Sequence, residues 1–149
     1  MNKMILLVED NPDDEALTLR AVRKHMPYGI VVARDGAEAL DFLFGTGSHA
    51  GRDVTASPLL VLLDLKLPKV NGLEVLRRLR EDQRTRPIPV IVFTSSTEEQ
   101  DILDSYRLGA NSYVRKPVDY GRFCGDLKQV MTYWLCVNQL PPQRNCSAP

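Results

Sequence analysis

Residues 59–64 read Leu-Leu-Val-Leu-Leu-Asp, a continuous apolar run that ends at a carboxylate. Short apolar runs without polar alternation are typical of strands in a parallel sheet that is covered on both faces. Four more such runs lie at 4–8, 30–33, 90–93 and 112–114. The sequence therefore predicts five buried strands.

The segments between these runs carry helical patterns. Asn11 and Pro12, followed by two acids, predict a helix whose cap is Asn11. Residues 37–44 predict a second helix that ends at Gly45, and residues 73–84 predict a third. The fourth helix is expected from the capping-box pattern Thr97-x-x-Gln100 to about residue 108, and the fifth along the stripe Phe123, Leu127, Val130 and Trp134.

Strand and helix alternate five times along the chain. This alternation predicts an α/β fold with a doubly wound parallel sheet and right-handed crossovers, because a barrel needs eight such units. A length of 149 residues suits one domain. We expect that domain to cover residues 1–140, with a long polar loop at 45–57, and residues 141–149 to form a flexible tail.

The composition excludes some classes of function. Acidic and basic residues number 19 each, whereas proteins that bind nucleic acid or membrane surfaces usually carry excess basic residues. We therefore expect no direct DNA binding, and we interpret Arg77, Arg78 and Arg80 as part of a solvated helix face. The apolar run at 4–8 is too short to cross a bilayer, and the three cysteines follow no metal-ligand spacing. The chain is expected to be soluble and cytoplasmic.

Polar residues follow four of the five predicted strands. Glu9 and Asp10 follow the first strand, Asp64 the third, Thr94 the fourth and Lys116 the fifth. The carboxyl ends of parallel strands meet at one edge of the sheet, where ligands bind in doubly wound folds. Each acid alone is also consistent with a turn or a helix cap. Together they indicate phosphoryl chemistry in which one of the carboxylates acts as nucleophile and Mg²⁺, which prefers oxygen ligands, offsets the repulsion among the acids.

Four strings that contain these residues resemble a known family. They are LLVEDNPDD at 6–14, LLDLKLPKVNG at 62–72, IVFTSS at 91–96 and YVRKPVD at 113–119. The chain resembles the receiver domains of response regulators in two-component signalling over about residues 3–137. The resemblance implies the fold of the chemotaxis response regulator, a flavodoxin-like three-layer sandwich with strand order 2-1-3-4-5.

The resemblance also implies roles for the acids. Asp64 matches the aspartate that accepts a phosphoryl group from a histidine kinase. Glu9 and Asp10 match the acidic pair that holds Mg²⁺ together with Asp64, and the backbone carbonyl of Lys66 matches the ligand that completes the metal sphere. Glu9 stands where many receivers have Asp, and Lys66 stands where Asn is common.

Further matches concern the phosphoryl group and the switch. Thr94 matches the hydroxyl that follows the phosphoryl group, and Lys116 matches the lysine that pairs with the phosphoryl oxygens. The peptide bond from Lys116 to Pro117 is expected to be cis. Tyr113 matches the aromatic residue that switches together with Thr94.

A narrower resemblance rests on NPDD at 11–14, the long loop at 45–57 and YWLCVNQLPP at 133–142. These features resemble stand-alone receivers that partner bacterial phytochromes, the red-light-sensing histidine kinases. The resemblance implies a homodimer through the fourth and fifth helices and the C-terminal extension. The residues expected at that contact are Met131, Leu135, Val137 and Leu140. The alternative is that they cover the sheet edge within one subunit.

The expected function is a phosphoacceptor switch that assists its own phosphorylation and dephosphorylation, rather than an enzyme with an external substrate. Two alternatives stay open. An aspartyl-phosphate phosphohydrolase would usually carry a second Asp two positions after the nucleophile, where this chain has Lys66. A flavodoxin-like cofactor binder would need a phosphate-binding loop after the first strand, where residues 9–14 are mostly acidic.

Overall fold

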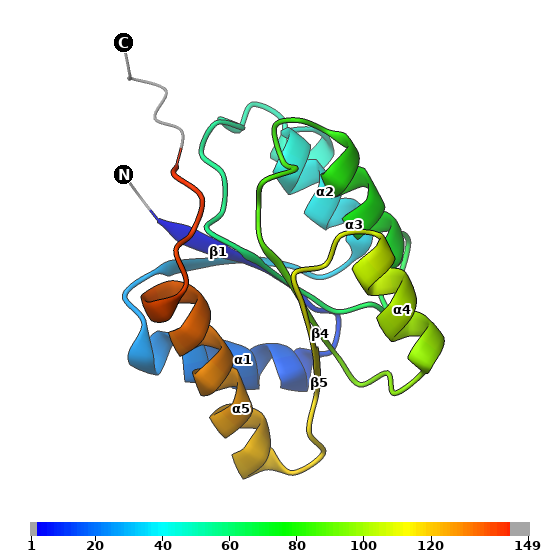
Figure 1. Cartoon of the computed structure of the whole chain (residues 1–149). Helices are drawn as coiled ribbons and strands as arrows, with labels where there is room; N and C mark the ends of the chain where they lie inside the picture. Colours follow the sequence, from blue (N-terminus) through cyan, green and yellow to red (C-terminus); the bar gives the residue numbers. More distant parts are fainter. Residues whose placement is uncertain (1–2, 144–149) are drawn as a thin grey trace.

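The five expected strands form one parallel sheet. The computed structural model describes residues 3–143 and orders the strands β2-β1-β3-β4-β5, which confirms the expected fold (Figure 1). The strands are β1 (Met4–Val8), β2 (Gly29–Ala33), β3 (Val61–Leu63), β4 (Val90–Thr94) and β5 (Ser112–Arg115).

Helices cover both faces of this sheet. They are α1 (Pro12–His25), α2 (Gly36–Phe44), α3 (Gly72–Glu81), α4 (Glu99–Arg107) and α5 (Tyr120–Thr132). Figure 1 shows α1 and α5 beside each other below the sheet, and α2, α3 and α4 on its other side. Two short elements complete the fold, a 3₁₀ turn at Gly47–His49 (η1) and a π-helical turn at Tyr133–Val137 (η2).

Alternate residues of the strands enter two separate cores. Leu63 and Val92 pack with α2 and α3, whereas Leu62 and Phe93 pack with α1 and α5. Both sides of each central strand are therefore apolar, because successive side chains of a strand point to opposite faces. This arrangement explains the unbroken apolar runs of the sequence.

The helix ends confirm some of the expected signals and correct others. The side chain of Asn11 accepts hydrogen bonds from the amides of Asp13 and Asp14, and Gly45 ends α2 in the left-handed conformation. The expected cap at Thr97 is wrong. The helix begins at Glu99, and Ser96 instead accepts a bond from the amide of Glu98 at 3.3 Å.

Helix α3 is shorter than expected and ends at Glu81 rather than at residue 84. The side chain of Asp82 accepts a hydrogen bond from the amide of Arg84 at 2.8 Å. The hydroxyl of Thr85 donates to the carbonyl of Leu79 at 2.6 Å. These local bonds satisfy the backbone in a turn, which competes with continuation of the helix.

Arg80 does not belong to a solvated face, which corrects the interpretation from the sequence. Its guanidinium donates to the carbonyls of Gly109, Arg86 and Ile88 at 2.7–2.9 Å. It also donates to the side chain of Asn111 at 2.7 Å. Arg80 therefore joins α3 to the loop before β4 and to the loop before β5.

The end of α5 and the turn after it correct one expected dimer residue. Met131 is 2% exposed and lies in the core with Phe123 and Leu127, so it cannot contact a partner. Leu135 packs partly against the same core, whereas Val137 is 62% exposed. The expectation of a flexible tail concerns mainly residues 144–149, which lie outside the described residues.

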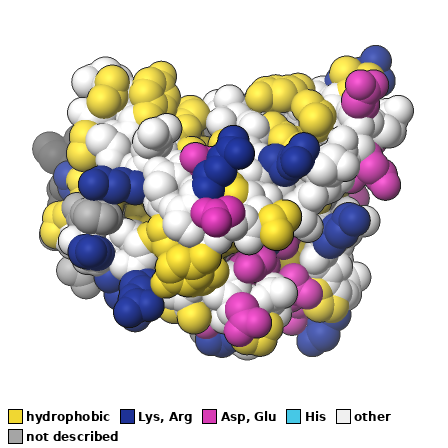
Figure 2. Space-filling model, turned by 90° about the horizontal axis from the view of Figure 1, so that it is seen from below, with side chains coloured by type: hydrophobic (Ala, Val, Ile, Leu, Met, Phe, Trp, Pro, Cys, Tyr) yellow, Lys and Arg dark blue, Asp and Glu magenta, His cyan; other side chains and the backbone are white. Residues whose placement is uncertain are grey.

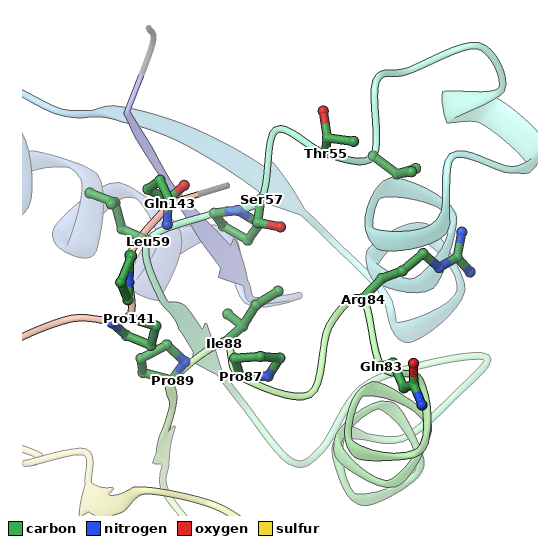
Figure 3. Close-up of a pocket in the computed structure, with 13 residues that line it drawn as sticks. Thr55, Ser57, Leu59, Gln83, Arg84, Pro87, Ile88, Pro89, Pro141 and Gln143 are labelled. Atoms are coloured by element: carbon green, nitrogen blue, oxygen red, sulfur yellow. The ribbon is translucent and has the colours of Figure 1, made fainter. Parts of the chain in front are cut away.

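Residues after η2 reach the edge of the sheet where strands β3 and β4 begin. Figure 3 shows Pro141 close to Pro89 and Leu59, beside a hollow of about 140 Å³. This hollow lies at the opposite end of the sheet from Glu9, Asp64 and the other acids described below. Among residues 3–143, no helix is both long and apolar enough to cross a membrane.

Candidate functional site

The carboxyl edge of the sheet brings the expected site residues together. Ladder hydrogen bonds extend one residue beyond the strands, since the amide of Asp64 donates to Val8 at 3.0 Å and that of Lys116 to Thr94 at 2.7 Å. The backbone of each residue is thus fixed by a neighbouring strand. Figure 2 views the molecule from below the orientation of Figure 1 and shows several acidic side chains close together on that face.

Three carboxylates at this edge form a compact group that we call the acid triad. It consists of Glu9, Asp10 and Asp64, and one carboxylate oxygen from each lies within 4.8 Å of the others. Glu9 and Asp64 are buried, whereas Asp10 is exposed. Oxygen ligands at this spacing fit a hard divalent cation, with Asp10 on the side from which it would enter.

Lys116 lies against the acid triad and is 7% exposed. Its Nζ atom is 2.6 Å from Oε1 of Glu9 and 2.9 Å from Oδ2 of Asp64. A third carboxylate, Oδ2 of Asp14, lies 2.8 Å away. The sequence had indicated Asp14 only as an acid in the first turn of a helix. Asn11 caps α1, so Asp14 is the third residue of the helix. At this position the side chain of Asp14 reaches Lys116.

These contacts set the protonation of the site. Burial alone would raise the pKa of Asp64, but the ammonium of Lys116 outweighs burial and holds that pKa below its ordinary value. Burial raises the pKa of Glu9 to about 7, against the opposing effect of Lys116. Burial would lower the pKa of Lys116, yet its bonds to Asp14, Asp64 and Glu9 raise it. Asp64 is therefore an ionised carboxylate beside an ammonium.

Thr94 and Tyr113 occupy different parts of the site. Thr94 is fully buried, and its hydroxyl interacts with Asp64 and helps to lower the pKa of that residue, after Lys116. Tyr113 is partly exposed, and its hydroxyl donates to the carbonyl of Ser96 at 3.1 Å. Ser96 in turn donates to Asp101 at 2.5 Å. The sequence did not identify Ser96, which anchors the loop between β4 and α4.

Two residues beside Asp64 and Lys116 complete the edge. The amide of Lys66 donates to Oδ1 of Asp64 at 3.4 Å, and Lys66 lines an open groove together with Asp10. The peptide bond between Lys116 and Pro117 is trans, because the described residues contain no cis peptide bond. The expected cis bond is therefore wrong, and the bond keeps the modest trans preference of any X–Pro pair.

The amino-acid sequence matches a known protein family over most of the chain. The family model described as the response regulator receiver domain matches residues 5–128. The chain belongs to the response regulator receiver family. It is 40% identical over 139 residues to the probable methanogenesis regulatory protein FilR2 of Methanothrix harundinacea, covering 93% of this chain and 87% of that protein. It is 34% identical over 140 residues to response regulator Rcp1 of Synechocystis sp., covering 93% of both proteins.

Solved structures of receivers agree with this assignment. The phosphorylated cyanobacterial phytochrome response regulator RcpA is 37% identical, with a TM-score of 0.87 over 95% of this chain and 100% of that one. The Mn²⁺-bound form of Rcp1 is 33% identical, with a TM-score of 0.87 over 94% and 99%. The bacteriophytochrome response regulator AtBRR is 48% identical, with a TM-score of 0.69 over 93% and 99%. This receiver thus has stand-alone response regulators among its relatives.

Proposed function

We propose that this receiver accepts a phosphoryl group from a histidine kinase on Asp64, with Mg²⁺ held by the acid triad. The observation that carries the proposal is the contact between Asp64 and Lys116, buried together beside Glu9. An ionised carboxylate, a fixed ammonium and a site for a divalent cation are the groups that phosphoryl transfer to a carboxylate needs. The existence of a Mn²⁺-bound form of the relative Rcp1 supports a divalent cation as part of this proposal.

Transfer of the phosphoryl group to Asp64 is a displacement at phosphorus. A carboxylate oxygen of Asp64 forms a bond to phosphorus, while the bond from phosphorus to the phosphohistidine nitrogen breaks and the histidine leaves with its electron pair. Lys116 and Thr94 stabilise the oxygens of the transferred group. Mg²⁺, when bound through Glu9, Asp10, Asp64 and the Lys66 carbonyl, supplies positive charge that offsets the charge on the phosphoryl group.

Phosphorylation then changes the conformation of a protein surface. Phosphorylation adds a charge of about −1.5 to −2 and new acceptor oxygens at Asp64. Thr94 moves toward these oxygens, and Tyr113 gives up its bond to Ser96 and moves inward. This change biases the face formed by α4, β5 and α5 between two arrangements. The output is a contact with another protein, a change in a homodimer or onward phosphotransfer.

A phytochrome-type histidine kinase is the partner that we propose. AtBRR is a bacteriophytochrome response regulator and RcpA a phytochrome response regulator, and both align over more than nine-tenths of this chain. Val118 offers a contact for the kinase, because its side chain is fully exposed two residues after Lys116. Tyr120 is also half exposed beside it.

Labelling with acetyl phosphate tests the acceptor. The chain is expected to take up labelled phosphoryl in the presence of Mg²⁺, with acetate as the leaving group, and Asp64→Asn is expected to abolish the uptake. Asp126→Asn is the matched control, because Asp126 lies on α5 and pairs only distantly with Arg122, at 3.8 Å. Labelling that persists in Asp64→Asn would show that another residue is the acceptor.

The same preparation distinguishes a switch from a phosphohydrolase. A phosphohydrolase would turn over a generic phosphate ester many times, and the position of its general acid is occupied here by exposed Lys66. We expect no sustained turnover of p-nitrophenyl phosphate by the wild-type chain. Sustained turnover that Asp64→Asn abolishes would favour the enzyme instead.

A further inference from the structure

Asp14 contacts Lys116 without belonging to the acid triad. Its Oδ2 lies 2.8 Å from Nζ of Lys116, and its own amide donates to the cap Asn11 at 3.1 Å. The side chain of Asp14 is 27% exposed, compared with 2% for Glu9 and 8% for Asp64. Asp14 is thus the partner of Lys116 that water reaches most easily.

The ammonium of Lys116 has no donor left for another ligand. It carries three N–H groups, and Glu9, Asp14 and Asp64 accept from them. A phosphoryl group on Asp64 needs at least one of these donors. Glu9 is too deeply buried to lose its partner without a large cost, whereas Asp14 can turn toward water. The bond between Asp14 and Lys116 is therefore the one that phosphorylation breaks.

Charge acts in the same direction. Asp14 and Asp64 accept from the same Nζ atom, so their carboxylates lie close together. A phosphoryl group on Asp64 brings a further charge of about −1.5 to −2 next to Asp14. Both the lost ion pair and this repulsion oppose phosphorylation. Neither affects a chain that is already phosphorylated, in which Asp14 has turned away.

We propose that Asp14 is a positioning residue that holds the ammonium of Lys116 in the unphosphorylated chain and thereby slows phosphorylation of Asp64. The proposal rests on the proposed function of Asp64 as the phosphoacceptor. Under this proposal, Asp14 affects the rates of phosphorylation and dephosphorylation differently. The rate of phosphorylation depends on Asp14, whereas the rate of dephosphorylation does not.

Labelling by acetyl phosphate with Mg²⁺ measures both rates. Asp14→Asn is expected to be labelled about two- to fivefold faster than wild type, the range for a partly exposed ion pair. Loss of label after removal of acetyl phosphate is expected to proceed at the wild-type rate. Asp14→Glu keeps the negative charge and is expected to restore slow labelling. A purely structural effect would not separate the two rates in this way.

Asp13→Asn is the matched control, because Asp13 is an exposed neighbour in the same helical turn and its amide shares the cap Asn11. It loses the same charge and is expected to behave like wild type. Labelling of Asp14→Asn that is equal to or slower than wild type would overturn the proposal and leave Asp64 as the acceptor. A wild-type chain that takes up no label would overturn the proposed function, and the role of Asp14 with it.

Discussion

Burial gives Glu9 a pKa of about 7, far above its ordinary value of 4.5. The folded chain therefore binds a proton at Glu9 more readily than the unfolded chain does. Its contribution to folding is complete below pH 4.5 and is lost as the pH rises through about 7. Asp64 has the opposite sign. Its pKa is lowered, so its contribution is present above the ordinary value of 3.8 and is lost as the pH falls.

The protonation of Glu9 also predicts how the cation depends on pH. A divalent cation competes with the proton on Glu9, so affinity for Mg²⁺ is expected to rise about tenfold between pH 6 and pH 8. The Mg²⁺-induced increase in Tm, measured over a Mg²⁺ titration at each pH, reports this affinity. Glu9→Gln removes the titrating group and is expected to give a weaker affinity that changes little with pH. A wild-type affinity that is flat over this interval would contradict the prediction.

Among the elements, the start of α3 controls the position of Asp64. Gly72 is the first residue of α3, and a Cβ atom there would lie 2.3 Å from the carbonyl oxygen of Asp64 and 2.6 Å from Cα of Leu65. Only glycine allows the helix to approach the loop after β3 this closely. The backbone around the proposed acceptor thus depends on a helix that contributes no side chain to the acid triad.

Gly72→Ala is therefore expected to be destabilised by about 1–3 kcal/mol, the usual range for overpacking, and to be labelled more slowly at Asp64. Gly125→Ala is the matched control, because Gly125 lies inside α5 and a Cβ atom there meets nothing within 4 Å. It is expected to stabilise the chain by about 0.5–1 kcal/mol. Urea unfolding measures both changes. An unfolding midpoint for Gly72→Ala at or above that of wild type would show that the space between α3 and the loop after β3 accommodates a methyl group.

The elements also show what the sequence could predict. The strands, their order and the cap at Asn11 follow from local patterns or from the family motifs, and the structure bears them out. Arg80 was misread, and the second role of Asp14 was missed, because both roles depend on partners far away in the chain. Arg80 contacts Asn111, and Asp14 contacts Lys116. Helical spacing identifies a charged residue on a surface turn, but it does not show which distant loop folds over that residue.

The prediction of the start of α4 was wrong for a different reason. Thr97 and Gln100 have the spacing of a capping box, but Ser96 is buried and binds Asp101 and the amide of Glu98. A serine one residue earlier thus fixes the residue that precedes the helix, and no side chain caps α4 itself. The same serine accepts the hydroxyl of Tyr113, so the loop that the sequence misplaced is the one that links the site to the surface.

At the scale of the whole molecule, two exposed valines lie beyond opposite ends of α5. Val118 precedes the helix beside Lys116, and Val137 follows it in η2, where Tyr133 is also half exposed. We propose that the first contacts the kinase and the second a second copy of the chain. Grouped apolar side chains on a surface mark protein contacts, and each valine lies within four residues of a half-exposed tyrosine, Tyr120 for Val118 and Tyr133 for Val137. The two surfaces should therefore respond independently to substitution.

Val137→Asp is expected to convert a homodimer into a monomer, because it places a charge where an apolar contact would be buried. Light scattering after size-exclusion chromatography measures the mass, which is expected to be twice that of one chain for wild type and that of one chain for the variant. Val118→Asp is the matched control. It is expected to stay dimeric and to accept phosphoryl from acetyl phosphate at the wild-type rate, but to accept it more slowly from a histidine kinase. A wild-type chain with the mass of one copy would contradict the proposed dimer. Loss of the dimer in Val118→Asp would show that the dimer contact lies at the start of α5 and not at its end.

Independent responses of the two variants would mean that the dimer and the kinase use separate surfaces. The chain could then remain a dimer while Asp64 receives its phosphoryl group.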